Sequence, residues 1–94
     1  MEESDHFQFL TTLNRELCAA VVAADETIEP CGHDSYSALT NAVEGPITLE
    51  LLKGLNDLQI RQIATAFNDF FECSAIKSSH IRQAIDSTIW HWGG

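Results

Sequence analysis

The feature that most constrains the fold is an apolar stripe at helical spacing near the start of the chain. The stripe consists of Leu10, Leu13, Leu17, Val21 and Ala24. Intervals of three and four residues place these side chains on one face of an α-helix. Ser4 or Asp5 can cap this helix, which we expect to run to about Ala24. A helix of that length spans roughly 30 Å, so one face of it can contact both the core and a partner.

A second stripe lies in the other half of the chain. Asn56 and Gln59 have the spacing of a capping box, in which each side chain bonds the backbone N–H of the other residue. The apolar residues that follow are Ile60, Ile63, Ala64, Phe67 and Phe71. This pattern predicts a helix that ends near Glu72.

The remaining segments also favour short helices. We expect a loop over 25–34, a helix that begins at Asp34 or Ser35 and ends before Gly45, and helical turns over 48–52. After a connector over 73–77, Ser78 or Ser79 is expected to cap a last helix. Its apolar face carries Ile81, Ile85, Ile89 and Trp92. With no β-hairpin signal, the sequence predicts an all-α domain of four to five helices spanning residues 1–94.

The size of the chain favours association. Its 94 residues are 45% apolar, which is enough for a core. A domain this small buries only roughly 60–65% of its unfolded surface. We therefore expect a homodimer, intertwined or side by side. Trp90 and Trp92, beside the chain end, fit core and interface roles equally well. The candidate dimer or partner residues are Leu10, Leu13, Leu17, Val21, Cys73, Trp90 and Trp92.

The charge is uneven along the chain. The formal net charge is -9, and the first 52 residues hold ten acidic side chains but one basic side chain, Arg15. Residues 53–94 hold four of each sign, the cations being Lys53, Arg61, Lys77 and Arg82. A negative molecule does not approach phosphate unaided. Contact with DNA is therefore expected only through the neutral half, inside a complex with a basic partner.

Catalytic and metal-binding patterns are missing from the sequence. It has no Gly-rich phosphate loop, no Gly-x-Ser-x-Gly and no His-Glu-x-x-His, so we expect no enzyme and no cofactor. Cys31 and His33 are two possible ligands in one loop, but no cysteine pair has the spacing of a structural zinc site. We expect no bound metal.

The cysteine count and the hydropathy of the chain indicate the cellular compartment of the protein. Three cysteines, Cys18, Cys31 and Cys73, fit reduced thiols better than a closed disulfide framework. No apolar run approaches the roughly 18 residues of a membrane span. The acidic start lacks the basic region of a signal peptide. We therefore expect a cytoplasmic protein that does not contact a membrane.

The segment from Leu58 to Ile89 imitates a helix-turn-helix, with an Ile-Ala pair in the first helix and a serine start to the second. The gap between Ala64 and Ser78 exceeds the usual turn, and two ordinary amphipathic helices fit the pattern too. If this segment meets DNA, the start of the last helix carries the contacts. The DNA-facing candidates are Lys77, Ser78, Ser79, His80, Arg82, Gln83 and Arg61.

Within this segment the chain resembles the FlhD family, the smaller subunits of the bacterial flagellar master activator and of related activators on conjugative elements. The matching residues are 55–64, Cys73, Ser78, Ile81 and Gln83, with Leu13 and Asn14 in the first helix. The likeness covers about residues 8–88. It implies a helical homodimer that pairs with a larger FlhC-like subunit, which binds zinc in that family. The two together bind promoter DNA.

The sequence thus predicts a non-catalytic subunit of a heteromeric transcriptional activator. Two other readings stay open. The ten acids of the first half also suit a small inhibitor of the mobile-element kind, which mimics DNA and blocks a nucleic-acid-binding target. A chaperone that holds a partner helix is the third reading.

Overall fold

The computed structural model describes residues 3–43 and 45–93. Helices account for all of the regular structure in these two ranges, so the predicted all-α class is confirmed. The helices are α1 (Glu3–Ala24), α2 (Asp34–Ala42), α3 (Leu49–Lys53), α4 (Asp57–Phe70) and α5 (Ser78–Gly93). Ser4 and Asp5 lie inside α1, and the position that would cap this helix is outside the described residues.

Most helix boundaries follow the local sequence signals. The predicted capping box opens α4, because the Asn56 side chain accepts from the Gln59 N–H and the Gln59 side chain accepts from the Asn56 N–H. Thr48 caps α3 by accepting from the Leu51 N–H at 3.1 Å, and Gly54 follows its last residue. The chain therefore enters both helices with a partner for an otherwise free N–H.

The start of α5 differs from the prediction. The Lys77 carbonyl accepts from the N–H groups of His80 and Ile81, which makes Lys77 the residue at the helix boundary. Ser78 and Ser79 lie in the first turn, so the prediction that one of them caps α5 was wrong. The Lys77 N–H in turn donates to Nδ1 of His80 at 3.0 Å. Histidine here takes the part that Glu or Gln plays in a capping box.

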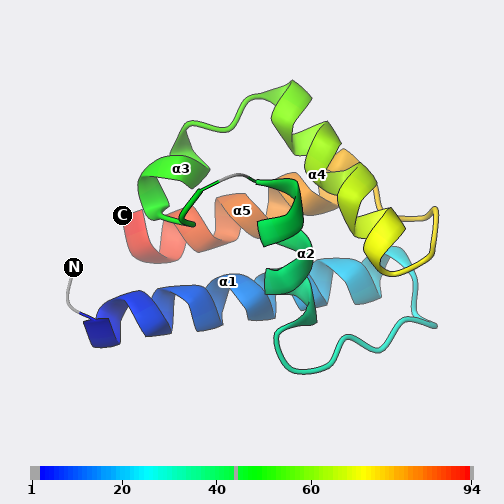
Figure 1. Ribbon diagram of the computed structural model, residues 1–94, viewed down its shortest axis with the longest axis horizontal. Coiled ribbons are helices and arrows are strands. Elements are labelled where there is room, and N and C mark those ends of the chain that lie inside the picture. The colour runs from blue at the N-terminus through cyan, green and yellow to red at the C-terminus, as the bar shows by residue number, and fades with distance from the viewer. Residues whose placement is uncertain (1–2, 44, 94) are drawn as a thin grey trace.

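The helices form two crossed layers (Figure 1). α1 runs along the bottom of the view, and α5 lies against it in the opposite direction. α2 packs against α1 and α4, while α4 and α3 each pack against α5. As a result, α1 begins and α5 ends on the same side of the molecule (Figure 1), and the starts of α4 and α5 come close together.

A single apolar core fills the space between the helices. Its largest fully buried side chains include Phe9, Leu13, Leu17, Leu39, Leu52, Ile60, Ile63, Phe67, Ile81 and Ile85. Trp92 folds back onto this core, with its ring edge-on to Phe9 at 6.3 Å between centroids and 89° between planes. The predicted stripes of the first, fourth and fifth helices therefore meet one another within a single chain.

This packing corrects part of the expected interface. Leu13, Leu17 and Val21 are 0% exposed in the isolated chain. A partner could reach them only by opening the fold, so these three residues belong to the core and not to an outer contact surface. They were chosen because an apolar stripe looks the same in sequence whether a chain covers it itself or a partner does.

Candidate nucleic-acid interface

Four of the seven predicted DNA-facing residues line one cleft. It lies between the first half of α4 and the first turns of α5 and has a volume of about 320 Å³. We call it the α4–α5 cleft, and its lining residues are Asp57, Ile60, Arg61, Ser78, Ser79 and Arg82. Ile60 is buried in the core, and the other lining residues are polar or charged.

Helix geometry gives this cleft a positive character in an otherwise acidic protein. Arg61 lies in the second turn of α4, and Arg82 lies in the second turn of α5. The exposed Ser78 and Ser79 belong to the first turn of α5, where backbone N–H groups have no partner inside the helix. The helix dipole adds a partial positive charge at the same place. Arginines and free N–H groups together suit an anion such as phosphate.

An ion pair crosses the cleft. Nη2 of the Arg82 guanidinium donates to Oδ1 of Asp57 at 2.6 Å. The two side chains are 38% and 94% exposed, respectively. Asp57 also has a cation four residues later on its own helix, Arg61, at the spacing of an intrahelical ion pair. Among the described residues its partner is Arg82, because packing of α5 against α4 brings the more distant arginine closer.

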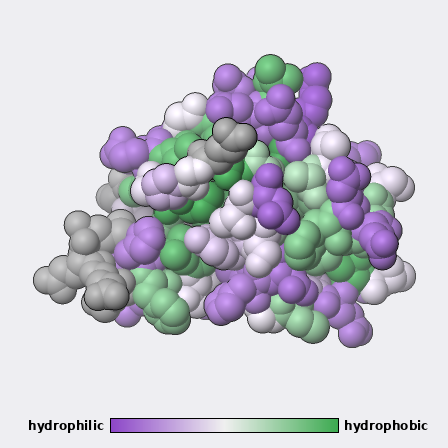
Figure 2. All heavy atoms as spheres, viewed as in Figure 1, coloured by the Kyte–Doolittle hydropathy of each residue, from purple (hydrophilic) through white to green (hydrophobic). Residues whose placement is uncertain are grey.

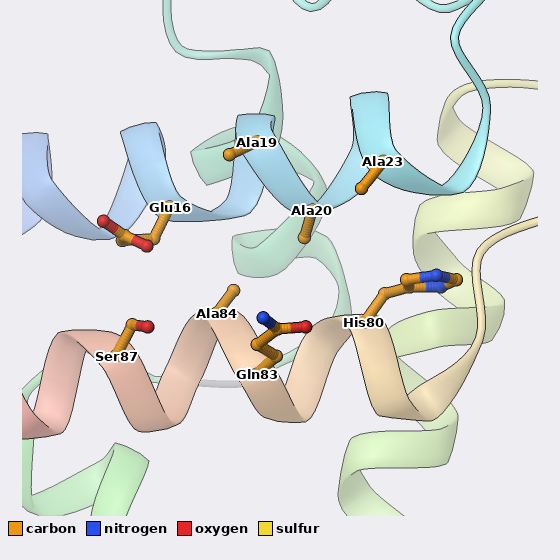
Figure 3. A pocket seen from close by; sticks show the side chains of 8 residues that line it. All are labelled: Glu16, Ala19, Ala20, Ala23, His80, Gln83, Ala84 and Ser87. Carbon is orange, nitrogen blue, oxygen red and sulfur yellow. The ribbon is translucent and has the colours of Figure 1, made fainter.

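The other DNA-facing candidates, His80, Gln83 and Lys77, lie outside this cleft. Figure 3 shows His80 and Gln83 on α5, where they line a separate hollow between α5 and α1, with Glu16 at the other end of the hollow opposite Ser87. Its remaining lining residues are Ala19, Ala20, Ala23 and Ala84. Lys77 is exposed in the connector before α5. The candidates on α5 therefore divide between two sides of that helix.

The remaining interface candidates differ in exposure. Trp90 is 79% exposed and is the most exposed large apolar side chain in the described part of the chain. Leu10, Cys73 and Trp92 are half-buried and pack against the core. Sequence reasoning missed Phe7 and Leu58, which are 65% and 60% exposed. Phe7 stands three residues before Leu10 and Leu58 two residues before Ile60, and neither predicted stripe gave a signal that they face outward.

The acidic surface has its own ordered segment after α1. Oδ1 of Asp25 accepts from the Thr27 hydroxyl at 2.6 Å and from the Thr27 N–H at 3.0 Å. These two hydrogen bonds, the hydroxyl first, lower the pKa of Asp25 below its ordinary value. Glu26 and Glu29 are exposed in the same loop. The loop therefore presents negative charge in the acidic first half of the chain, which would bind the target if the protein is an inhibitor.

Over residues 3–43 and 45–93, no group of three or more His, Cys, Asp or Glu side chains is placed to hold a metal ion. Cys31 is exposed, with its thiol against the Glu29 carbonyl at 3.4 Å. In the same residues no helix has the length and hydropathy to cross a membrane.

Comparisons with protein-family models, curated proteins and solved structures found no match to this chain. The resemblance to the FlhD family therefore remains a prediction from the residues that carry it.

Proposed function

We propose that this protein is a cytoplasmic, non-catalytic subunit of an FlhD/FlhC-type transcriptional activator, and that it assembles as a homodimer with a larger, basic DNA-binding subunit. Within that complex the α4–α5 cleft lies against the phosphate backbone of promoter DNA. One observation carries the proposal: Arg61, Arg82 and the first turn of α5 meet in a single cleft. These are the groups that recur at protein contacts with phosphate.

The charge of the molecule explains why a partner is needed. With a formal net charge of -9, the free chain repels DNA over distances comparable to the Debye length, roughly 10 Å at 0.1 M salt. A basic subunit bound beside it offsets this repulsion. The cleft then contributes a local phosphate contact that positions the complex, while the larger subunit reads the base sequence.

Isolation of the native complex tests this function. The tagged chain is purified from its host, the partner is identified by mass spectrometry, and the complex is titrated with promoter DNA at several salt concentrations. We expect Arg61→Ala and Arg82→Ala to weaken binding, and each to reduce the salt slope by about one unit as one phosphate contact is lost.

Lys53→Ala is the matched control, because Lys53 is an exposed cation at the end of α3 that does not line the cleft. This variant should bind DNA as the wild type does. DNA binding that is insensitive to both arginine changes would contradict the proposal.

The inhibitor reading is the second candidate, and the ordered acidic loop after α1 favours it. In that case the target binds the loop in competition with DNA. Charge reversal at Asp25 and Glu26 should then abolish function, and changes at Arg61 and Arg82 should leave it intact. The same titration, with these variants included, separates the two functions.

A further inference from the structure

Asp57 lines the α4–α5 cleft and is not the residue that caps its own helix. The N-terminus of α4 is capped by Asn56 and Gln59, which satisfy each other's backbone N–H groups. The Asp57 side chain is 94% exposed, so it fills no space in the core. Its described interaction is the 2.6 Å hydrogen bond across the cleft to Arg82.

We propose that Asp57 is an internal competitor for phosphate, which occupies Arg82 in the free chain and is displaced by a DNA phosphate in the complex. This inference rests on the proposed function and adds a regulatory residue to the same cleft. The carboxylate of Asp57 and a phosphodiester offer the same kind of acceptor oxygens to a guanidinium. They therefore exclude one another at Arg82.

The geometry suits an exchange more than a permanent lock. Both partners are open to water, and only one guanidinium nitrogen is engaged at hydrogen-bond distance. Exposed ion pairs of this kind contribute little to stability, so a competing anion can replace Asp57 at low cost. With Asp57 in place, the cleft holds one negative charge against two arginines, which keeps stray DNA from binding until a partner adds positive potential.

Removal of the Asp57 charge should therefore strengthen anion binding at this cleft. Asp57→Asn keeps the size of the side chain and leaves the Asn56–Gln59 capping box untouched. Asp86→Asn is the matched control, because Asp86 is an exposed acid on α5 that does not line the cleft. Both variants raise the net charge of the chain by one unit, so any difference between them reports position.

The test uses the native complex with a short promoter duplex, because the free chain, at a net charge of -9, repels DNA most strongly at low ionic strength. Affinity is measured by fluorescence anisotropy, and the amide signals of Ser78 and Ser79 are followed by NMR. We expect Asp57→Asn to bind the duplex at least about three-fold more tightly than Asp86→Asn does, because one negative charge close to the phosphate is lost. In an Arg82→Ala background this advantage should disappear. A thermal melt by circular dichroism verifies that each variant is folded.

The outcomes separate this inference from the proposed function. If Arg82→Ala weakens DNA binding by the native complex, but Asp57→Asn and Asp86→Asn bind the duplex equally, the internal competitor is refuted and the proposed function stands. If DNA binding by the complex ignores Arg82, the proposed function falls. A gain in Asp57→Asn that persists without Arg82 also overturns the inference.

Discussion

At the scale of single residues, two asparagines inside helices hold the long connections in place. Asn14 of α1 donates to the Gly32 carbonyl and accepts from the Tyr36 N–H, both at 2.9 Å. Tyr36 is in the first turn of α2, and the side chain of His33, the residue just before α2, makes no capping hydrogen bond. Asn14 therefore caps α2 from a neighbouring helix. Asn68 plays the corresponding part for the connector between α4 and α5.

Replacement of Asn68 should loosen that connector. Its amide donates to the Ile76 carbonyl at 2.9 Å and accepts from the Ile76 N–H at 3.0 Å. Asn68→Ala leaves the backbone C=O and N–H of the buried Ile76 without a hydrogen-bond partner. We therefore expect the free energy of unfolding, measured by urea titration, to fall by about 2–3 kcal/mol. Asn41→Ala, at an exposed position of α2, is the control and should change stability by less than about 0.5 kcal/mol. Equal effects of the two changes would show that Asn68 is not a clamp.

Glu72 is strained where α4 ends. Its φ is 55°, in the left-handed region that favours glycine, and the Cys73 N–H closes the turn onto the Asn68 carbonyl at 2.9 Å. Glu72→Gly should raise the free energy of unfolding by about 1 kcal/mol, because glycine adopts this φ without a Cβ clash. Glu72→Ala removes the same charge but keeps the clash, so it should give no such gain. A thermal melt of the two variants decides, and equal stability would argue against backbone strain.

At the scale of elements, the sequence predicted what depends on local chemistry. The capping box at Asn56 and the helical periodicity of α1, α4 and α5 involve residues a few positions apart, and the structure contains them. The cap that Asn14 of α1 supplies to α2 was missed because Asn14 and Tyr36 are 22 residues apart in the sequence. The His80 cap was missed because histidine is not among the usual capping residues.

The candidate site was predicted only in part for a related reason. Ser78, Ser79 and Arg82 do lie together near the start of α5, as sequence neighbours must. His80 and Gln83 point to the other side, because successive residues turn by roughly 100° around a helix. The pairing of Arg82 with Asp57 joins residues 25 positions apart, and no local pattern encodes it.

The tryptophans at the end of α5 should behave differently. Trp92 packs edge-on against Phe9, and its indole N–H is buried without a partner. Trp92→Ala should cost about 3 kcal/mol, whereas Trp92→Phe should cost much less, because it keeps an aromatic ring and removes the unpaired N–H. Trp90→Ala is the control at a concentration low enough to keep the chain monomeric, since that side chain is 79% exposed. Urea titrations in which the Trp90 change costs as much as the Trp92 change would contradict this assignment.

At the scale of the whole molecule, the single chain has about the accessible surface and the radius of gyration of a monomeric protein of its size. Its accessible surface is 5745 Å² for 10.4 kDa, against about 5400 Å² from the scaling for monomers. The radius of gyration is 12.2 Å, against about 12.4 Å for a compact domain of this length. Figure 2 shows hydrophilic and hydrophobic side chains interspersed over the face in view. The core therefore does not need a second chain to complete it.

This closure changes what kind of homodimer we expect. The buried first helix favours two folded chains side by side over an intertwined pair, with the exposed Trp90 in the contact. Sedimentation at low micromolar concentration should show a dimer, and Trp90→Ala should shift it to a folded monomer. Leu58→Ala is the control, because Leu58 is 60% exposed at the start of α4. A wild-type monomer with a cooperative melt at that concentration would refute the dimer, and a variant that unfolds as it dissociates would favour intertwined chains.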